Sequence, residues 1–424
     1  MAEQYDVIGL DRQGRGVVTT SDATIYVKGA LPGDVVTGMV LDGEIETPHF
    51  VSKSGHHTQT VIDGERSPAA PLQHIADPLY SEWKASLVND ALAANGIDVE
   101  LQPLVPCAPQ TRRRAAFSVI QTQVGLNFGF QRPRSHEIIA DYDCPVLAPL
   151  LVKARPALKA LAKAALPIMA EKAKPATMLT TVTKTGLDVA MEGVERLNSE
   201  RREAALKIAL KANLARLSIN GELIVETRKP IVLFDDIPVE IPAGAFLQAV
   251  PAIEAQMREL VASHLTGTKR VLDLFSGCGT FSLPLAKNHT VHAVEMDQAS
   301  LDALAAAARK QPTLKQVSTE RRDLFERPVT TAEMEGFDAL VFDPPRAGAE
   351  AQAKEIAQSP IEKVAAVSCN PETLARDLRI LMDGGYALKS VTPFDQFLWT
   401  HHVEAVALLG KPKRKKSKAA RQGW

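Results

Sequence analysis

The chain has 424 residues, 45% hydrophobic and 23% charged, with a formal net charge of −1 at pH 7. Two or three globular domains are expected from this length and composition. No apolar run is long enough for a membrane span, the first residues lack a secretion signal, and the four cysteines show no paired spacing. We therefore expect a cytoplasmic protein without membrane segments or disulfides.

Residues 1–55 alternate in short stretches between glycine-rich turns, which predicts a small β-barrel of the oligonucleotide-binding type. A linker and a helix are expected over 56–96. Asp77-Pro78 predicts the start of this helix, with Asp77 as the N-cap and Pro78 as the first helical residue. Asn95-Gly96 predicts its end.

Residues 97–237 mix helical and extended patterns, which indicates a separate α+β domain. The expected helices and strands are helices 152–173 and 198–213, and strands near 178–190, 216–226 and 230–234. Residues 411–424 contain seven Lys or Arg and no acid. Such a basic tail is disordered by itself and acts either as a phosphate-binding arm or as a solubilising segment.

From 238 to 410 strands alternate with helices. A helix is expected over 250–264, and strands over 270–275, 291–294, 339–342, 364–368 and 403–409. This alternation predicts an α/β domain with a doubly wound, Rossmann-like sheet, whose ligand binds at the carboxyl ends of the strands.

The turn after the first of these strands is rich in glycine. Gly277 and Gly279 allow a ligand to approach the backbone, and a helix is expected to follow with free N–H groups. Glu295 ends the next strand, where an acid can accept hydrogen bonds from ribose hydroxyls. Ser282 occupies the third glycine position of a dinucleotide motif, which disfavours NAD.

Asp273 stands at the mouth of the same turn. A carboxylate repels a pyrophosphate but attracts the α-ammonium group of S-adenosylmethionine, so the charge favours the methyl donor. Asp323 follows the third strand and is expected near the adenine, unless it is an ordinary surface acid.

Three further segments, Asp343-Pro-Pro-Arg-Ala-Gly348, Ser368-Cys-Asn-Pro371 and Thr400-His-His-Val-Glu404, lie at strand ends. If the last strand runs antiparallel, Asp343, Cys369 and Glu404 converge at the ligand edge. A thiolate that adds to C6 of uracil activates C5 for methylation, and a separate base must then remove the C5 proton. We expect Cys369 to be the nucleophile, in a polar and partly exposed pocket, and Glu404 to be the base.

Each of these residues also has an ordinary structural explanation, such as core packing for Cys369 or a salt bridge for Glu404. The occurrence of Asp343, Cys369 and Glu404 together at one edge of the sheet is harder to explain by structural roles alone. His401 and His402 have no Cys or His companions and are expected to be structural, so no metal site is predicted.

Together these motifs resemble the RNA 5-methyluridine methyltransferases, in particular the ribosomal-RNA branch with an N-terminal TRAM domain. The resemblance covers residues 14–36, 271–286, 343–348, 368–371 and 400–404. It implies a class I methyltransferase domain, Cys369 as nucleophile and Glu404 as base. The implied donor contacts are Gln248, Phe275, Thr280, Glu295 and Asp343, and the implied RNA contacts are Arg112, Arg113 and Arg114, to which we add Arg346.

The chain departs from the family pattern where many relatives hold an iron–sulfur cluster with four cysteines. Ser67 and Ala70 occupy two of those places, Val61 lies near the third, and only Cys144 remains. One thiolate cannot hold such a cluster, so none is expected. Phe397-Leu-Trp-Thr400 departs from relatives with proline after the Phe, which leaves the shape of this loop open.

The resulting hypothesis is a monomeric enzyme that forms 5-methyluridine in RNA, with 23S ribosomal RNA favoured over transfer RNA. A purine N-methyltransferase that uses Asp343-Pro-Pro is a second hypothesis, but Arg346 stands where such sites carry a stacking aromatic residue. A third is a non-catalytic RNA-binding or assembly factor.

Overall fold

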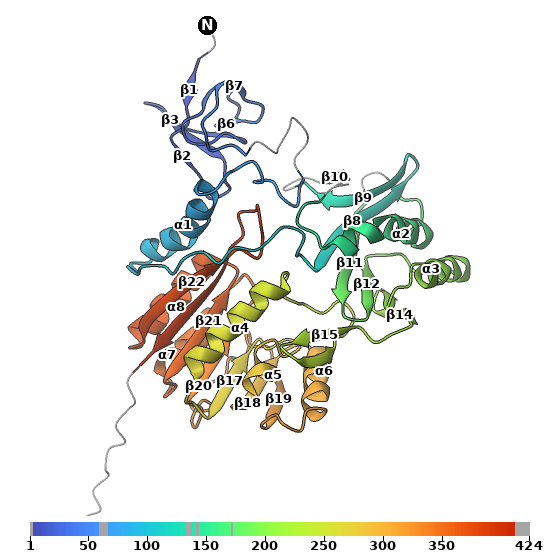
Figure 1. The fold of residues 1–424 in the computed structure, drawn as a ribbon, viewed down its shortest axis with the longest axis vertical. Helices are drawn as coiled ribbons and strands as arrows, with labels where there is room; N and C mark the ends of the chain where they lie inside the picture. The colour runs from blue at the N-terminus through green and yellow to red at the C-terminus, as the bar shows by residue number, and fades with distance from the viewer. Residues whose placement is uncertain (1–2, 59–66, 133–136, 141–143, 171–172, 412–424) are drawn as a thin grey trace, which may run out of the picture.

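The N-terminal part of the chain is a small β domain (Figure 1). The computed structural model describes residues 3–58, 67–132, 137–140, 144–170 and 173–411. The strands of this domain are β1 (Tyr5–Asp6), β2 (Gly9–Leu10), β3 (Gly16–Thr19), β4 (Thr24–Val27), β5 (Val35–Thr37), β6 (Glu44–Ile45) and β7 (His49–Ser52). They form two sheets, of order β1-β5-β7 and β2-β3-β4-β6, around the buried side chains of Val27, Val36 and Ile45.

Helix α1 (Leu79–Ala94) connects the β domain to the rest of the molecule. The expected cap is wrong, because Pro78 is the N-cap residue and no side chain caps the helix. The Asp77 carboxylate instead accepts a hydrogen bond from Ser81 Oγ at 2.6 Å. The expected end is confirmed, since Asn95 is the C-cap and Gly96 has a positive φ of 66°.

The central domain is built on a seven-stranded sheet of order β10-β9-β8-β11-β12-β13-β14. Its strands are β8 (Arg114–Thr122), β9 (Gly125–Gln131), β10 (Ile138–Ile139), β11 (Ala176–Thr183), β12 (Gly186–Glu192), β13 (Arg216–Ile219) and β14 (Glu222–Glu226), and its helices are α2 (Pro149–Ala165) and α3 (Ser199–Lys211). Helix α2 ends well before the expected residue 173. Pro167 forces Leu166 into an extended conformation with a ψ of 136°, which stops the helix.

A hairpin of β15 (Ile231–Phe234) and β16 (Ile237–Glu240) follows the central sheet. Its buried side chains share one cluster with Leu283 and Leu304 of the next domain. This packing favours a domain boundary before Ile231, since the expected boundary at 237 falls inside the hairpin.

The C-terminal domain contains a second seven-stranded sheet, of order β19-β18-β17-β20-β21-β23-β22. Its strands are β17 (Arg270–Leu274), β18 (Thr290–Glu295), β19 (Val317–Arg321), β20 (Ala339–Phe342), β21 (Lys363–Ser368), β22 (Ala387–Phe394) and β23 (Glu404–Gly410), and its helices are α4 (Pro251–Leu265), α5 (Ser282–Leu285), α6 (Gln298–Arg309), α7 (Glu350–Gln358) and α8 (Pro371–Asp383). Strands β17 to β21 are parallel, whereas β23 pairs antiparallel with β21, as expected. Strand β22 was not anticipated from the sequence.

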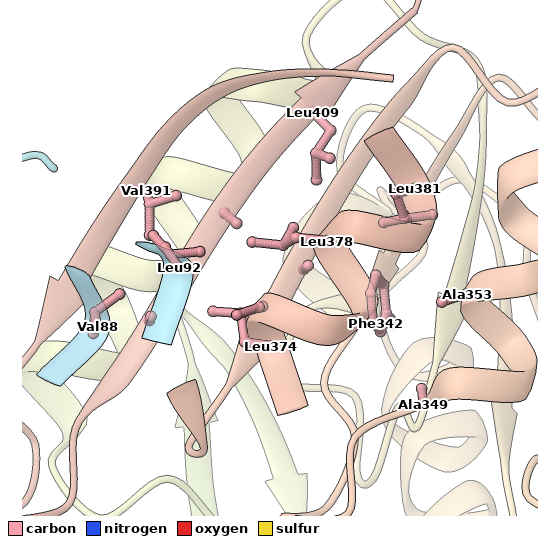
Figure 2. Packing of buried hydrophobic residues seen from close by; sticks show 14 of the residues in the cluster. Val88, Leu92, Phe342, Ala349, Ala353, Leu374, Leu378, Leu381, Val391 and Leu409 are labelled. Carbon is pink, nitrogen blue, oxygen red and sulfur yellow. The ribbon is translucent and has the colours of Figure 1, made fainter. Parts of the chain in front are cut away.

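Alternate residues of this sheet face two separate cores. Leu272, Leu340 and Phe342 face the side covered by α1, α7 and α8, and Val271 and Val341 face the side covered by α4 and α5. Figure 2 shows Leu374, Leu378 and Leu381 of α8 on the same side as Phe342, with Val88 and Leu92 of α1 close to Val391. Helix α1 is therefore part of the core of the C-terminal domain. Among the residues that the structure describes, no helix is long and apolar enough to cross a membrane.

Candidate active site

The strand register brings Cys369 and Glu404 together. Ser368, the last residue of β21, pairs with Ala405 of β23, so Cys369 comes next to Glu404, the first residue of β23. Asp343 follows β20, whose last residue pairs with Ala366 of β21. The expected convergence at the carboxyl edge of the parallel strands is present in the structure.

Glu404 is buried, with 2% of its surface exposed. One carboxylate oxygen, Oε2, accepts a hydrogen bond from Gln396 Nε2, whereas Oε1 has no hydrogen-bond partner. Burial, followed by the nearby Asp343 carboxylate, raises the pKa of Glu404 well above its usual value. The raised pKa makes the ionised Glu404 a stronger base toward a proton on carbon than an exposed carboxylate would be.

Two glutamines connect Glu404 to Asp343. Gln396 Nε2 also donates to Gln248 Oε1 at 2.7 Å, and Gln248 Nε2 donates to Asp343 Oδ2 at 2.9 Å. Solvent still reaches part of the Asp343 side chain, but its protein surroundings raise its pKa by desolvation. Sequence reasoning found Gln248 by resemblance and missed Gln396, for which no motif gave a signal.

The Cys369 side chain is partly exposed, as expected, but its surroundings do not favour the thiolate. Burial, followed by the charges of Glu404 and Asp343, raises the pKa of Cys369 to about 11. The Arg346 guanidinium acts in the opposite direction. Arg346 is exposed and lies 3.0 Å from a ring nitrogen of His402. In the protein alone, these surroundings therefore favour the protonated thiol.

The glycine-rich turn after β17 is tightly built. Gly277 donates its N–H to Glu295 Oε2 at 3.0 Å, and a Cβ atom at Gly277 would contact nothing, so open space lies beside it. Gly279 has a φ of 95°, and a Cβ there would lie 2.9 Å from Leu304 Cγ. The helix expected after the turn is a single turn, α5, so its dipole is weaker than that of a full helix.

Asp273 is fully buried at this turn, and Oδ2 accepts a hydrogen bond from Ser282 Oγ at 2.5 Å. Its other oxygen, Oδ1, and the nearby Ser276 Oγ are buried without partners. Burial raises the pKa of Asp273 to about 7, and the charges of Asp343 and Glu295 add to the effect. A buried acceptor without a donor costs free energy. These two oxygens therefore fit a ligand that brings its own N–H or O–H groups, as the amino and hydroxyl groups of S-adenosylmethionine would.

The remaining expected donor contacts lie around the same turn. Phe275 adopts a positive φ of 60°, and its ring lies 5.6 Å from that of Phe325. Asp323 Oδ1 accepts the backbone N–H of Phe325 at 2.9 Å, which places this acid in a local turn. Thr280 is partly exposed in the turn itself. Glu295 holds the backbone of Met296 and Asp297 as well as Gly277.

The three arginines expected to face RNA lie in different environments. Arg113 is buried and donates to Glu254 Oε2 at 2.6 Å and to the Gln248 carbonyl oxygen at 3.1 Å, which does not fit an RNA contact. Arg112 and Arg114 are partly exposed and lie over the rings of Phe397 and Phe246, respectively.

A buried lysine that the sequence did not reveal supports the loop before Glu404. Lys84 of α1 is fully buried, lies 2.8 Å from Asp395 Oδ1 and donates to the carbonyl oxygens of Phe397 and Thr400. Tyr80 Oη donates to Asp395 Oδ2 at 2.9 Å. Helix α1 therefore fixes the segment that carries Gln396 and precedes Glu404.

All four cysteines are free thiols. Cys144 is buried and accepts a hydrogen bond from Ser67 Oγ at 3.9 Å, Ala70 is buried, and Val61 lies outside the described residues. Within the described parts of the chain, no three His, Cys, Asp or Glu side chains are grouped so that they could hold a metal ion. The rings of His401 and His402 contact each other in a tilted arrangement, with centroids 4.0 Å apart.

Comparison with known proteins places the chain in a family. A protein 46% identical to the chain, covering 98% of the chain and all of its own length, is an uncharacterized RNA methyltransferase of Mesorhizobium japonicum. The 23S rRNA (uracil(1939)-C(5))-methyltransferase RlmD of Halomonas elongata is 31% identical over 95% of the chain and 88% of its own length.

The fold is also that of a solved structure, the Pyrococcus abyssi tRNA (uracil-54, C5)-methyltransferase in complex with S-adenosyl-L-homocysteine. It has a TM-score of 0.75 and 22% identity, and covers 96% of this chain and 100% of its own. The family model described as tRNA (Uracil-5-)-methyltransferase matches residues 173–412. The chain therefore belongs to this family of S-adenosylmethionine-dependent RNA (uracil-C5)-methyltransferases.

Proposed function

We propose that the protein forms 5-methyluridine in 23S ribosomal RNA, with Cys369 as covalent nucleophile and Glu404 as general base. The observation that carries this proposal is the register that sets these two residues side by side, at the sheet edge where the glycine-rich turn lies. S-Adenosylmethionine, when bound, supplies a methyl group on a positively charged sulfur.

In the proposed reaction, the Cys369 sulfur forms a bond to uracil C6, and the electron pair of the C5=C6 bond moves toward C5 and O4. C5 then becomes nucleophilic enough to take the methyl group. Glu404 accepts the C5 proton, the C5=C6 bond forms again, and the sulfur leaves C6. Asp343 and Gln248 belong to the hydrogen-bond network that reaches Glu404, and we propose that they orient the donor.

The donor is proposed to bind between the glycine-rich turn and Asp343. Asp273 Oδ1 and Ser276 Oγ offer unpartnered acceptors. Glu295 and Asp323 are proposed to face the ribose and the adenine, beside Phe275, Gly277, Gly279 and Thr280. A cation bound next to Asp343 would offset the carboxylate charge that raises the Cys369 pKa.

RNA is proposed to approach from the side of Arg112, Arg114 and Arg346, which are at least partly exposed. The preference for ribosomal RNA rests on the 31% identical relative from Halomonas elongata and on the small N-terminal β domain. Transfer RNA is the alternative, supported by the family description. We propose that the protein acts as a monomer in the cytoplasm.

The decisive experiment compares wild type and Cys369→Ala on 23S ribosomal RNA and bulk transfer RNA from cells that lack the protein. The modified nucleosides are identified by mass spectrometry. We expect 5-methyluridine with wild type and none with Cys369→Ala, while calorimetry shows unchanged affinity for S-adenosylhomocysteine. Substantial turnover by Cys369→Ala, or an N-methylated purine as product, would refute the proposal.

A further inference from the structure

The Gln396 side chain is held in a single orientation. It lies two residues beyond the end of β22 and is 1% exposed. Its Oε1 accepts the backbone N–H of Ala249 at 3.1 Å, and because that N–H can only donate, the amide nitrogen must point the other way. There it donates to Gln248 Oε1 and to Glu404 Oε2.

This orientation makes the two oxygens of Glu404 unequal. Oε2 is occupied by the amide of Gln396, and Oε1 is buried with no partner. We propose that Gln396 is a positioning residue that holds the Glu404 carboxylate through Oε2 and leaves Oε1 as the oxygen that takes the uracil C5 proton.

The inference rests on the proposed function and concerns its last step. The C5–H bond breaks as Oε1 gains the proton, the freed electron pair forms the C5=C6 bond, and the C6–S bond breaks with its electrons returning to Cys369. Methyl transfer precedes this step and does not need the base. Gln396 should therefore affect release of the RNA and not formation of the covalent adduct.

The charges around Glu404 come from several elements. Asp343 after β20 raises the Glu404 pKa, Arg346 in the same turn lowers it, and Cys369 lies on the adjacent strand end. The hydrogen bond from Gln396 also lowers it. Without this bond the base is protonated at higher pH, so the release step loses rate at neutral pH and regains it as the pH rises.

The test is Gln396→Met, which keeps a similar volume and removes the amide. The assays use a 23S ribosomal RNA transcript with uridine and the same transcript with 5-fluorouridine. Fluorine cannot leave C5 as a proton, so every competent enzyme stops at the methylated covalent adduct on the second RNA. Adduct is measured by denaturing gel electrophoresis.

Gln352→Met is the matched control. Gln352 is also 1% exposed and makes two hydrogen bonds with the backbone of Val329, away from Glu404. If Gln396→Met fails to fold, Gln396→Asn provides a milder variant that keeps an amide with a shorter reach. Adduct formation on 5-fluorouridine RNA and affinity for S-adenosylhomocysteine verify that each variant is intact.

With 5-fluorouridine RNA we expect equal adduct formation by wild type, Gln396→Met and Gln352→Met. With uridine RNA we expect only Gln396→Met to accumulate adduct and to release product roughly ten- to a hundredfold more slowly, as expected for loss of a hydrogen bond to a charged group. The deficit should shrink as the pH is raised above 7.

If Gln396→Met releases product at the wild-type rate, or if its loss of release rate does not depend on pH, the role assigned to Gln396 is wrong. The proposed function would not be affected by either result. Failure of the wild type itself to form an adduct with 5-fluorouridine RNA would overturn the proposed function instead. The two failures are thus separate.

Discussion

Replacing the proposed base should make the nucleophile more reactive toward a simple alkylating reagent. The charge of Glu404 is among the causes that raise the Cys369 pKa to about 11, second only to burial. Glu404→Gln removes this charge with little change in shape. The Cys369 thiolate is more stable when one of the neighbouring carboxylates is removed. The pKa of Cys369 should therefore fall, and its thiolate fraction at a given pH should rise.

The magnitude follows from Coulomb's law. Two unit charges a few ångströms apart interact by roughly 1–4 kcal/mol at the effective dielectric constants of protein surfaces and clefts, so the pKa of Cys369 should fall by roughly 0.7–3 units, about one unit in a solvated cleft. The thiolate fraction then rises about tenfold. Because a less basic thiolate is also a weaker nucleophile, the net gain in alkylation rate is about threefold.

The assay is the rate of carbamidomethylation of the Cys369 peptide by iodoacetamide, followed by mass spectrometry from pH 6.5 to pH 10. The difference should grow as the pH rises, because only the ionised Glu404 of the wild type raises the pKa of Cys369. Glu372→Gln is the control, since Glu372 is exposed and pairs with Arg12. If Glu404→Gln is no faster than wild type at any pH in this range, the electrostatic explanation of the thiol pKa is refuted.

Three further predictions concern side chains around the site. Arg113→Met leaves the buried Glu254 with one partner fewer and should lower the free energy of unfolding by roughly 3–5 kcal/mol in urea titrations; a loss of RNA affinity at unchanged stability would instead restore Arg113 as an RNA contact. Asp273 has a pKa of about 7 in the fold against 3.8 for the free group, so its contribution to stability is full below 3.8 and is lost as the pH rises through 7. Asp273→Asn should therefore become more stable relative to donor-free wild type between pH 5 and pH 8 by differential scanning fluorimetry, and a difference that stays constant would contradict this sign. Lys84→Met and Asp395→Asn break the same buried ion pair. In a double-mutant cycle, the changes that they cause in the free energy of unfolding should be non-additive by more than about 0.5 kcal/mol. Additive changes would show that the two side chains are not coupled.

The catalytic domain was the part of the fold most open to prediction from the sequence. Strand β20 has the expected bounds, and β17, β18, β21 and β23 are within one residue at each end. These strands are buried on both faces, so their sequences are continuous apolar runs that alternate with helices. Strand β22 carries Lys389 and Pro393 and has partly exposed residues at its start. Its sequence therefore has no continuous apolar run from which a strand could be predicted.

Side-chain partners were harder to foresee than strand ends. The positions of Cys369 and Glu404 follow from topology, because an antiparallel last strand begins where its parallel neighbour ends. The burial of Arg113 depends on α4, which brings Glu254 from more than a hundred residues away. An arginine cluster has the same sequence pattern whether it faces RNA or a buried carboxylate. The cap of α1 was missed for a similar reason, because Asp77 can bind either the backbone or the Ser81 hydroxyl.

The buried ammonium group of Lys84 has a consequence for how this protein can be divided. The segment that orients Gln396 and precedes Glu404 is fastened by a helix that lies more than three hundred residues earlier in the chain. A fragment that starts after residue 237 would contain every proposed catalytic side chain, yet it would leave Asp395 without its countercharge and expose the apolar surface that α1 covers. Recombinant truncation of the first two domains should therefore yield an aggregation-prone polypeptide rather than a minimal enzyme.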